Sequence, residues 1–312
     1  MSETFSLWPK PAPALDAAAQ DGVVHPRVLR LSEAGGGEAY CLLLWRTLQR
    51  PEALQRAVQQ AIEATLLAEL SACPPTKRPP PVGLRLLSPA PLPAPARAAL
   101  QSLSLAPEPH RQALDTWWPK AQPRLRHEAS LAAQALPEHC PQAYWLPIRC
   151  APAIGTDALS ALDAALHTAL ADAPFGQRPG HPTRALLTAL HQQGHLPHAA
   201  LDAGTLPAIE AALSSSALDT LRWLPPRLFQ ALSDLIGTCA VRLHDLPLAW
   251  AEAQHDAAGR TTAPLLRRAC ADGRTVLLPV GLHLLRWWIM PRRPGEDIAP
   301  MHAWLADWAA GE

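Results

Sequence analysis

Residues 226–239 read PRLFQALSDLIGTC, and this stretch decides the predicted fold class because it follows a helical period. Pro226 suits the first turn of a helix, where its missing backbone N–H removes no hydrogen bond. The apolar residues then recur at every third or fourth position, as one face of an amphipathic helix requires. They are Leu228, Phe229, Leu232, Leu235, Ile236 and Cys239. The pattern predicts a helix that buries this side against other elements.

Similar helical signals occur on both sides of this stretch. Thr156 can cap a helix with a leucine stripe, Pro182 opens a helix that Gly194 ends, and Pro300 opens the final helix. Further helices are predicted at 205–214, 217–224, 247–259 and 264–273. Because the connections are short, neighbouring helices should pack nearly antiparallel. The sequence therefore predicts an irregular C-terminal helical bundle.

The N-terminal part is predicted to be a smaller α+β region that contains a short sheet. Residues 23–31 and 39–46 are predicted strands on either side of a glycine-rich turn, and 82–88 is a third. Pro51 begins a predicted helix whose apolar residues repeat every four positions. Residues 143–150 form either a fourth strand or an extended connection.

The change of pattern near residue 150 divides the chain into two predicted domains, an α+β region at 1–150 and a helical domain at 151–312. Within the first, nine prolines fall in a proline-rich insertion at 74–95. Such runs favour extended backbone with few hydrogen bonds. The insertion is predicted to be a surface loop or spacer, and a docking peptide for an aromatic groove is the alternative.

Composition excludes several classes of protein. Lys+Arg and Asp+Glu number 27 each, and hydrophobic residues make up 48%, which excludes a polybasic or acidic tail and wholesale disorder. No uncharged apolar stretch is long enough for a transmembrane segment, and no targeting segment is recognised. The six cysteines form no CxxC pair, so they are predicted to be reduced thiols in the cytoplasm. Neither a phosphate-binding loop nor a GxGxxG motif occurs, so no cofactor is predicted.

Tryptophan is the strongest anomaly, with 11 residues against 3 Phe and 2 Tyr. Successive residues on a helix point about 100° apart, so at least one member of each adjacent pair should lie near a surface or a second packing layer. Charged residues are only 17% of the chain, which leaves few ions to keep an indole-rich surface in water. The predicted docking anchors are Trp117, Trp118, Trp287 and Trp288, with Arg286, Arg292 and Arg293 as a polar rim.

Two alternatives rest on other residues. His191, His195 and His198 have the residue types of a metal site and would suit a metal-dependent enzyme, although Gly194 and Pro197 interrupt the helix that would align them. Arginine outnumbers lysine 24 to 3, which would suit a nucleic-acid-associated subunit that contacts the backbone, although the net charge is zero. The main hypothesis is a non-enzymatic accessory or structural subunit that docks on other proteins in a cytoplasmic assembly.

Overall fold

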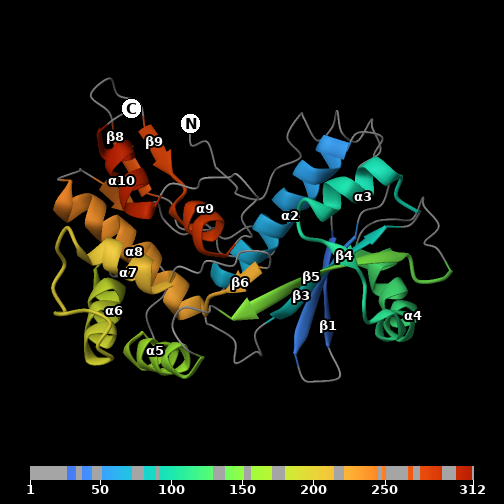
Figure 1. The fold of residues 1–312 in the computed structure, drawn as a ribbon, viewed down its shortest axis with the longest axis horizontal. Coiled ribbons are helices and arrows are strands. Elements are labelled where there is room, and N and C mark those ends of the chain that lie inside the picture. The colour runs from blue at the N-terminus through green and yellow to red at the C-terminus, as the bar shows by residue number, and fades with distance from the viewer. Residues whose placement is uncertain are drawn as a thin grey trace.

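The chain is an α/β mixture in which helices predominate, as a computed structural model shows (Figure 1). The structure describes residues 27–32, 37–43, 51–71, 81–88, 91–128, 138–150, 156–170, 180–213, 221–244, 248–250, 266–269, 275–289 and 300–310.

A mixed sheet draws on both halves of the chain. Its strands are β1 (Arg27–Ser32), β2 (Glu38–Leu43), β3 (Pro81–Ser88), β4 (Ala106–Pro107), β5 (Gln142–Cys150) and β6 (Leu221–Trp223). The order is β1-β2-β3-β5, and both β4 and β6 pair with β5. β2 pairs parallel to β3 and β5 pairs parallel to β6, whereas the other pairs are antiparallel. The three predicted N-terminal strands are thus confirmed where they are described, and 143–150 is a strand.

Helices cover both faces of this sheet. On one face, α2 (Pro51–Ser71) and α3 (Ala94–Gln101) pack against the main core, which includes Tyr40, Leu84 and Leu86 of the strands. On the other face, α4 (Arg111–Glu128) packs against a smaller cluster that contains Cys41 and Leu87. Figure 1 shows the sheet between α2 and α4. α2 begins at Pro51, as predicted.

A buried ion pair ties β4 to the sheet. The guanidinium of Arg85, which is fully buried on β3, donates to the Glu108 carboxylate, with Nε 2.7 Å from Oε2. The Arg85 guanidinium also lies 4.4 Å from the ring centre of Trp145. Gly83 has to be glycine, because a Cβ there would lie 2.0 Å from Cη2 of Trp145. The side of the sheet that faces α4 therefore holds this indole in one place.

The second half surrounds one central helix. Its helices are α5 (Thr156–Ala169), α6 (His181–Gln192), α7 (Thr205–Leu213), α8 (Pro226–Leu243), α9 (Val280–Leu284), the π-helical turn η1 (Leu285–Ile289) and α10 (Met301–Ala310). α8 contacts α2, α5, α6, α9 and α10. Its first fourteen residues are buried with few exceptions. The helix predicted from the sequence is thus confirmed, and other elements pack against its polar side as well as its apolar side.

Two helices begin at a carboxylate that another helix supplies. At α6, the buried Asp234 of α8 accepts the backbone N–H groups of Gly180 at 3.0 Å and Thr183 at 3.0 Å, and the Thr183 hydroxyl donates to it at 2.7 Å. At α10, Glu210 of α7 accepts the backbone N–H of His302 at 2.9 Å and also bonds Nδ1 of its ring. These contacts satisfy N–H groups that have no partner inside their own helix. They also fix where α6 and α10 start relative to α8 and α7.

Three predicted helices are wrong where the structure describes them. β6 lies in the predicted helix 217–224, β7 (Leu248–Trp250) lies in 247–259, and β8 (Leu266–Ala269) lies in 264–273. β7 and β8 form a second, antiparallel sheet with β9 (Thr275–Leu278), in the order β7-β8-β9. Strands of three or four residues are too short to show an alternating pattern. The Pro and Gly residues around them mark ends of strands as readily as ends of helices.

One continuous hydrophobic core crosses the predicted domain boundary. It extends from Tyr40 on β2 to Leu305 on α10, and β6 pairs with the end of β5 next to residue 150. In the described residues, no helix combines the length and hydrophobicity needed to cross a bilayer.

Candidate interaction site

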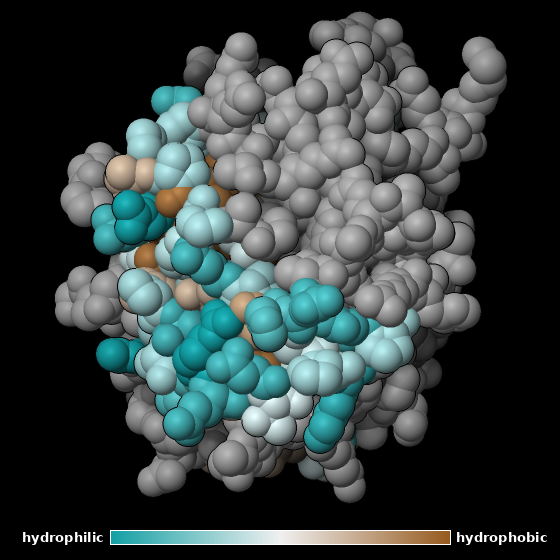
Figure 2. Space-filling model, turned by 90° about the vertical axis from the view of Figure 1, so that its right-hand side faces the viewer, coloured by the Kyte–Doolittle hydropathy of each residue, from teal (hydrophilic) through white to brown (hydrophobic). Residues whose placement is uncertain are grey.

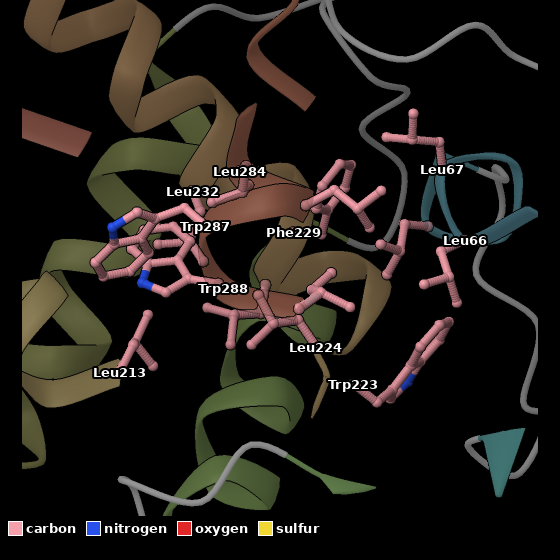
Figure 3. Close-up of a cluster of buried hydrophobic side chains, with 14 of the residues drawn as sticks. Leu66, Leu67, Leu213, Trp223, Leu224, Phe229, Leu232, Leu284, Trp287 and Trp288 are labelled. Atoms are coloured by element: carbon pink, nitrogen blue, oxygen red, sulfur yellow. The ribbon is translucent and has the colours of Figure 1, made fainter. Parts of the chain in front are cut away.

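Trp287 and Trp288 lie inside the protein, which corrects their predicted place on a docking surface. Both belong to η1, and they are 4% and 2% exposed. Their ring centres are 4.5 Å apart in an edge-to-face arrangement with an interplanar angle of 77°. Figure 3 shows them beside Leu213 and Leu232 within the main core. They stabilise the fold rather than present a surface.

The surroundings of η1 explain why both indoles can be buried. η1 contacts α2 and β6, so apolar neighbours lie on more than one side of it. Arg222 of β6 is buried as well, and its guanidinium donates to the backbone oxygens of Leu213 at 3.2 Å and Trp287 at 3.4 Å. The prediction that one member of each tryptophan pair faces a surface assumed that the helix packs on one side only. η1 packs against other elements on more than one side, so both of its indoles are covered.

The other tryptophan pair behaves as predicted for a helix with one packing side. Trp118 of α4 is 1% exposed and belongs to the smaller core cluster, whereas Trp117 is only half-buried. Their ring centres are 6.3 Å apart. Figure 2 views the side of the molecule on which α3 and α4 lie in Figure 1, and its coloured part is mostly hydrophilic. Trp117 is therefore a single half-buried indole that packs against the smaller cluster, and Trp118 is a core residue.

Arg286 is on the surface and already has an acidic partner. Its side chain is 47% exposed, whereas that of Glu63 on α2 is 7% exposed. Nε of Arg286 lies 3.0 Å from Oε1 of Glu63, and Nη2 lies 3.1 Å from Oε2. The pair joins η1 to α2 across 223 residues of sequence. The other two predicted rim residues, Arg292 and Arg293, lie outside the described residues.

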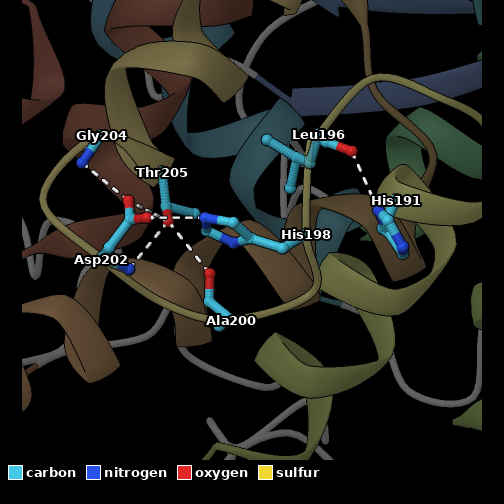
Figure 4. Close-up of polar contacts among 7 residues, drawn as sticks. All are labelled: His191, Leu196, His198, Ala200, Asp202, Gly204 and Thr205. Carbon is cyan, nitrogen blue, oxygen red and sulfur yellow. Dashed lines mark hydrogen bonds and ion pairs between the residues drawn. The ribbon is translucent and has the colours of Figure 1, made fainter.

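The predicted metal-binding histidines do not converge. α6 ends at Gln192, and Gly194, with φ of 76°, turns the chain, so His191 and His195 do not share a helix face. Nδ1 of His191 bonds the backbone oxygen of Leu196 at 3.0 Å, and Figure 4 shows the ring turned away from His198. No group of three or more His, Cys, Asp or Glu residues in the described ranges can hold a metal ion. The described residues therefore give no support to a metal site at these three histidines.

His198 instead belongs to the loop that starts α7. Its Nε2 lies 3.1 Å from Oδ2 of Asp202. Oδ1 of Asp202 accepts the Gly204 N–H at 2.8 Å and the Thr205 hydroxyl at 3.0 Å. The Thr205 hydrogen bond is the main reason why the pKa of Asp202 is lowered. This arrangement is typical of a helix start in which a side chain binds the first free N–H groups.

Three cysteines, Cys41, Cys140 and Cys239, are buried and form no disulfide. Burial raises the pKa of Cys140 to about 11 and that of Cys239 to about 12. Cys140 and Cys239 are therefore thiols rather than nucleophilic thiolates at neutral pH.

A more suitable surface lies where α9, which continues into η1, contacts α10. Trp304 and Trp308 are half-buried and pack on the main core from one side of α10, since they are four residues apart. The His283 ring of α9 lies 4.1 Å from the Trp304 ring, tilted by 32°. Burial, and then the charge of Arg286, lower the pKa of His283 to about 4, so this imidazole is neutral at pH 7. We call His283, Arg286, Trp304 and Trp308 the α10 face.

The sequence contained one sign of this surface. Trp304 and Trp308 follow Pro300, where the final helix is predicted to begin, and their spacing of four residues indicates a shared face. Their half-exposure depends on what packs behind α10, which periodicity does not specify. No family model, curated protein or solved structure matches this chain.

Proposed function

We propose that this protein is a non-enzymatic accessory subunit of a cytoplasmic assembly, which docks on another protein through the α10 face. The supporting observation is the pair of half-buried indoles, Trp304 and Trp308, together with His283, whose ring contacts Trp304 and whose pKa the charge of Arg286 helps to lower. Tryptophan and arginine are the side chains that most often carry the binding energy of an interface. The amphipathic indole suits such a place, since its ring can be covered while its N–H finds a polar partner.

The area of these side chains is large enough to matter. An indole buries roughly 150–250 Å² when fully covered, and no more than about a third of each of these two indoles is exposed, so covering that part removes at most roughly 50–80 Å² from water. At about 25 cal/mol per Å², each indole contributes at most about 2 kcal/mol to binding. Two of them supply up to about half of the ~8 kcal/mol that a micromolar complex requires.

The α10 face is also held in place before a partner arrives. Met301 and Leu305 of α10 are buried in the main core, and Glu210 binds the first turn through His302. The neutral His283 ring packs on Trp304. A surface that is already ordered loses less conformational entropy on binding, so more of its contact energy appears as affinity.

Site-specific photo-crosslinking tests this proposal. A photoreactive amino acid replaces the exposed Asp307 on α10 in the full chain, which is expressed with the products of its neighbouring genes. The matched control carries the same group at the exposed Gln112 on α4. We expect one discrete protein adduct from position 307, lost when Trp308→Ala is added, and no such adduct from position 112. A monomer without adducts, or equal adducts from both positions, would contradict the proposal.

A further inference from the structure

Among the described residues, Arg286 uses only two of its five N–H donors. A guanidinium has five N–H donors, one on Nε and two on each terminal nitrogen. Glu63 is bound side-on, through Nε at 3.0 Å and Nη2 at 3.1 Å. This arrangement leaves the second N–H of Nη2 and both N–H groups of Nη1. Together they form a second fork, suited to a second carboxylate.

The second fork lies on the exposed side of the guanidinium. The Glu63 side chain is only 7% exposed, so the edge of Arg286 that faces it is shielded from water. The 47% exposure of the Arg286 side chain therefore belongs largely to its remaining parts. Glu63 is the one hydrogen-bond acceptor that the described part of the chain gives to Arg286. Because Glu63 also accepts from Gln59 at 3.1 Å, it is itself held in position.

An imidazole and an indole connect Arg286 to α10. His283 lies three residues before Arg286, on the same side of the helical segment, and its lowered pKa keeps it neutral at pH 7. Its ring packs on Trp304. A partner that approaches here meets one cationic fork beside an aromatic surface. The complementary chemistry is a carboxylate with apolar side chains next to it.

Building on the proposed function, we infer that the α10 face recognises a protein segment in which an Asp or Glu is flanked by apolar residues. The partner carboxylate accepts from Nη1 and Nη2 of Arg286, while the flanking residues cover Trp304 and Trp308. Glu63 occupies only Nε and one N–H of Nη2, and its charge partly neutralises that of the guanidinium. A partner carboxylate adds to the Glu63 contact and does not displace it.

Two variants that break the same internal ion pair test the inference with opposite expected signs. Random peptides displayed on phage are selected against the full chain, and those that lose affinity for Trp308→Ala are kept as ligands of the α10 face. Arg286→Gln should weaken the kept peptides by about 10- to 100-fold, the usual effect of losing a charged hydrogen bond. Glu63→Gln should tighten them about two- to five-fold, because Arg286 then no longer shares its charge with a second carboxylate. Arg184→Gln, at an exposed arginine of α6, should change nothing.

The same peptides supply a second readout. Replacing their Asp or Glu by the amide should weaken binding to the natural chain at least ten-fold and leave binding to Arg286→Gln almost unchanged, because the two substitutions remove the same contact. Arg286→Lys keeps the positive charge but lacks two parallel N–H donors, so it should bind the peptides about ten-fold more weakly. Thermal melts of all variants establish that each is folded.

The outcomes separate this inference from the proposed function. Two results would overturn recognition by Arg286: selected peptides that lack an acidic residue, or equal weakening of binding by Glu63→Gln and Arg286→Gln. Docking through α10 would still stand in either case if the adduct at position 307 forms. Absence of that adduct would instead count against docking itself.

Discussion

Replacing Asp234 by alanine should destabilise the protein by about 2 kcal/mol, because a buried helix start loses its cap. The Thr183 N–H lies in a residue that is 3% exposed, and a buried N–H without a partner costs about 1–3 kcal/mol. The Gly180 N–H is half-exposed, so water can replace the carboxylate there. The Thr183 hydroxyl still has the Thr238 hydroxyl as a hydrogen-bond partner at 3.1 Å, so its lost bond to Asp234 adds little to the destabilisation. The substitution also removes a buried carboxyl group, which no longer has to be desolvated on folding, and this gain offsets part of the destabilisation.

Equilibrium urea unfolding followed by circular dichroism measures this loss as a difference in the free energy of unfolding. Asp163→Ala is the matched control, because Asp163 on α5 is half-buried and accepts no hydrogen bond from the described residues. Burial is also the main cause that raises the pKa of both carboxyl groups. The control should change stability by no more than about 0.5 kcal/mol. Equal effects of the two substitutions would refute the argument that capping, rather than burial of a carboxyl group, makes Asp234 important.

Three further predictions concern other conditions and sites. Because the pKa of Asp234 is raised, the native state keeps this proton to higher pH than the unfolded chain, so the stability of the natural protein relative to Asp234→Asn should fall as pH rises above about 4. Urea unfolding of both proteins between pH 4 and 7 measures this difference, and a rise would contradict it. Gly83→Ala should destabilise by about 1–3 kcal/mol, since its Cβ would lie 2.0 Å from Trp145 and the indole would have to move; an unchanged thermal midpoint would show the ring to be mobile. Cys140 and Cys239, with pKa values of about 11 and 12, should resist iodoacetamide at pH 8 in the native protein and react in urea, as peptide mass spectrometry would report; labelling without urea would count against their burial.

The long elements of the fold were predictable because each carries its own period. α2 and α8 show apolar residues at helical spacing over 21 and 18 residues, and β3 and β5 are apolar runs of strand length. β6 has only three residues, LRW, and its partner β5 lies more than 70 residues earlier. A strand of that length is defined by its neighbour, so no local pattern identifies it.

The candidate site was predictable only in part, for a similar reason. The sequence identified tryptophan and arginine as the unusual residues, and Arg286 is indeed on the surface. The burial of Trp287 and Trp288 follows from the position of η1 against α2 and β6, which tertiary packing determines. Likewise, the pair of Glu63 and Arg286 joins residues 223 positions apart, a separation that no spacing rule covers.

The pairing of β6 with β5 has a practical consequence for dividing this molecule. A chain severed near residue 150 would leave the end of β5 without its parallel neighbour, and α2 without the surface that α8 and η1 give it. Neither fragment could then shield its apolar residues, so we expect each to aggregate when produced alone. Produced together, the two should reconstitute the native form, which would make this a split protein whose reassembly reports on the proximity of whatever is fused to the pieces.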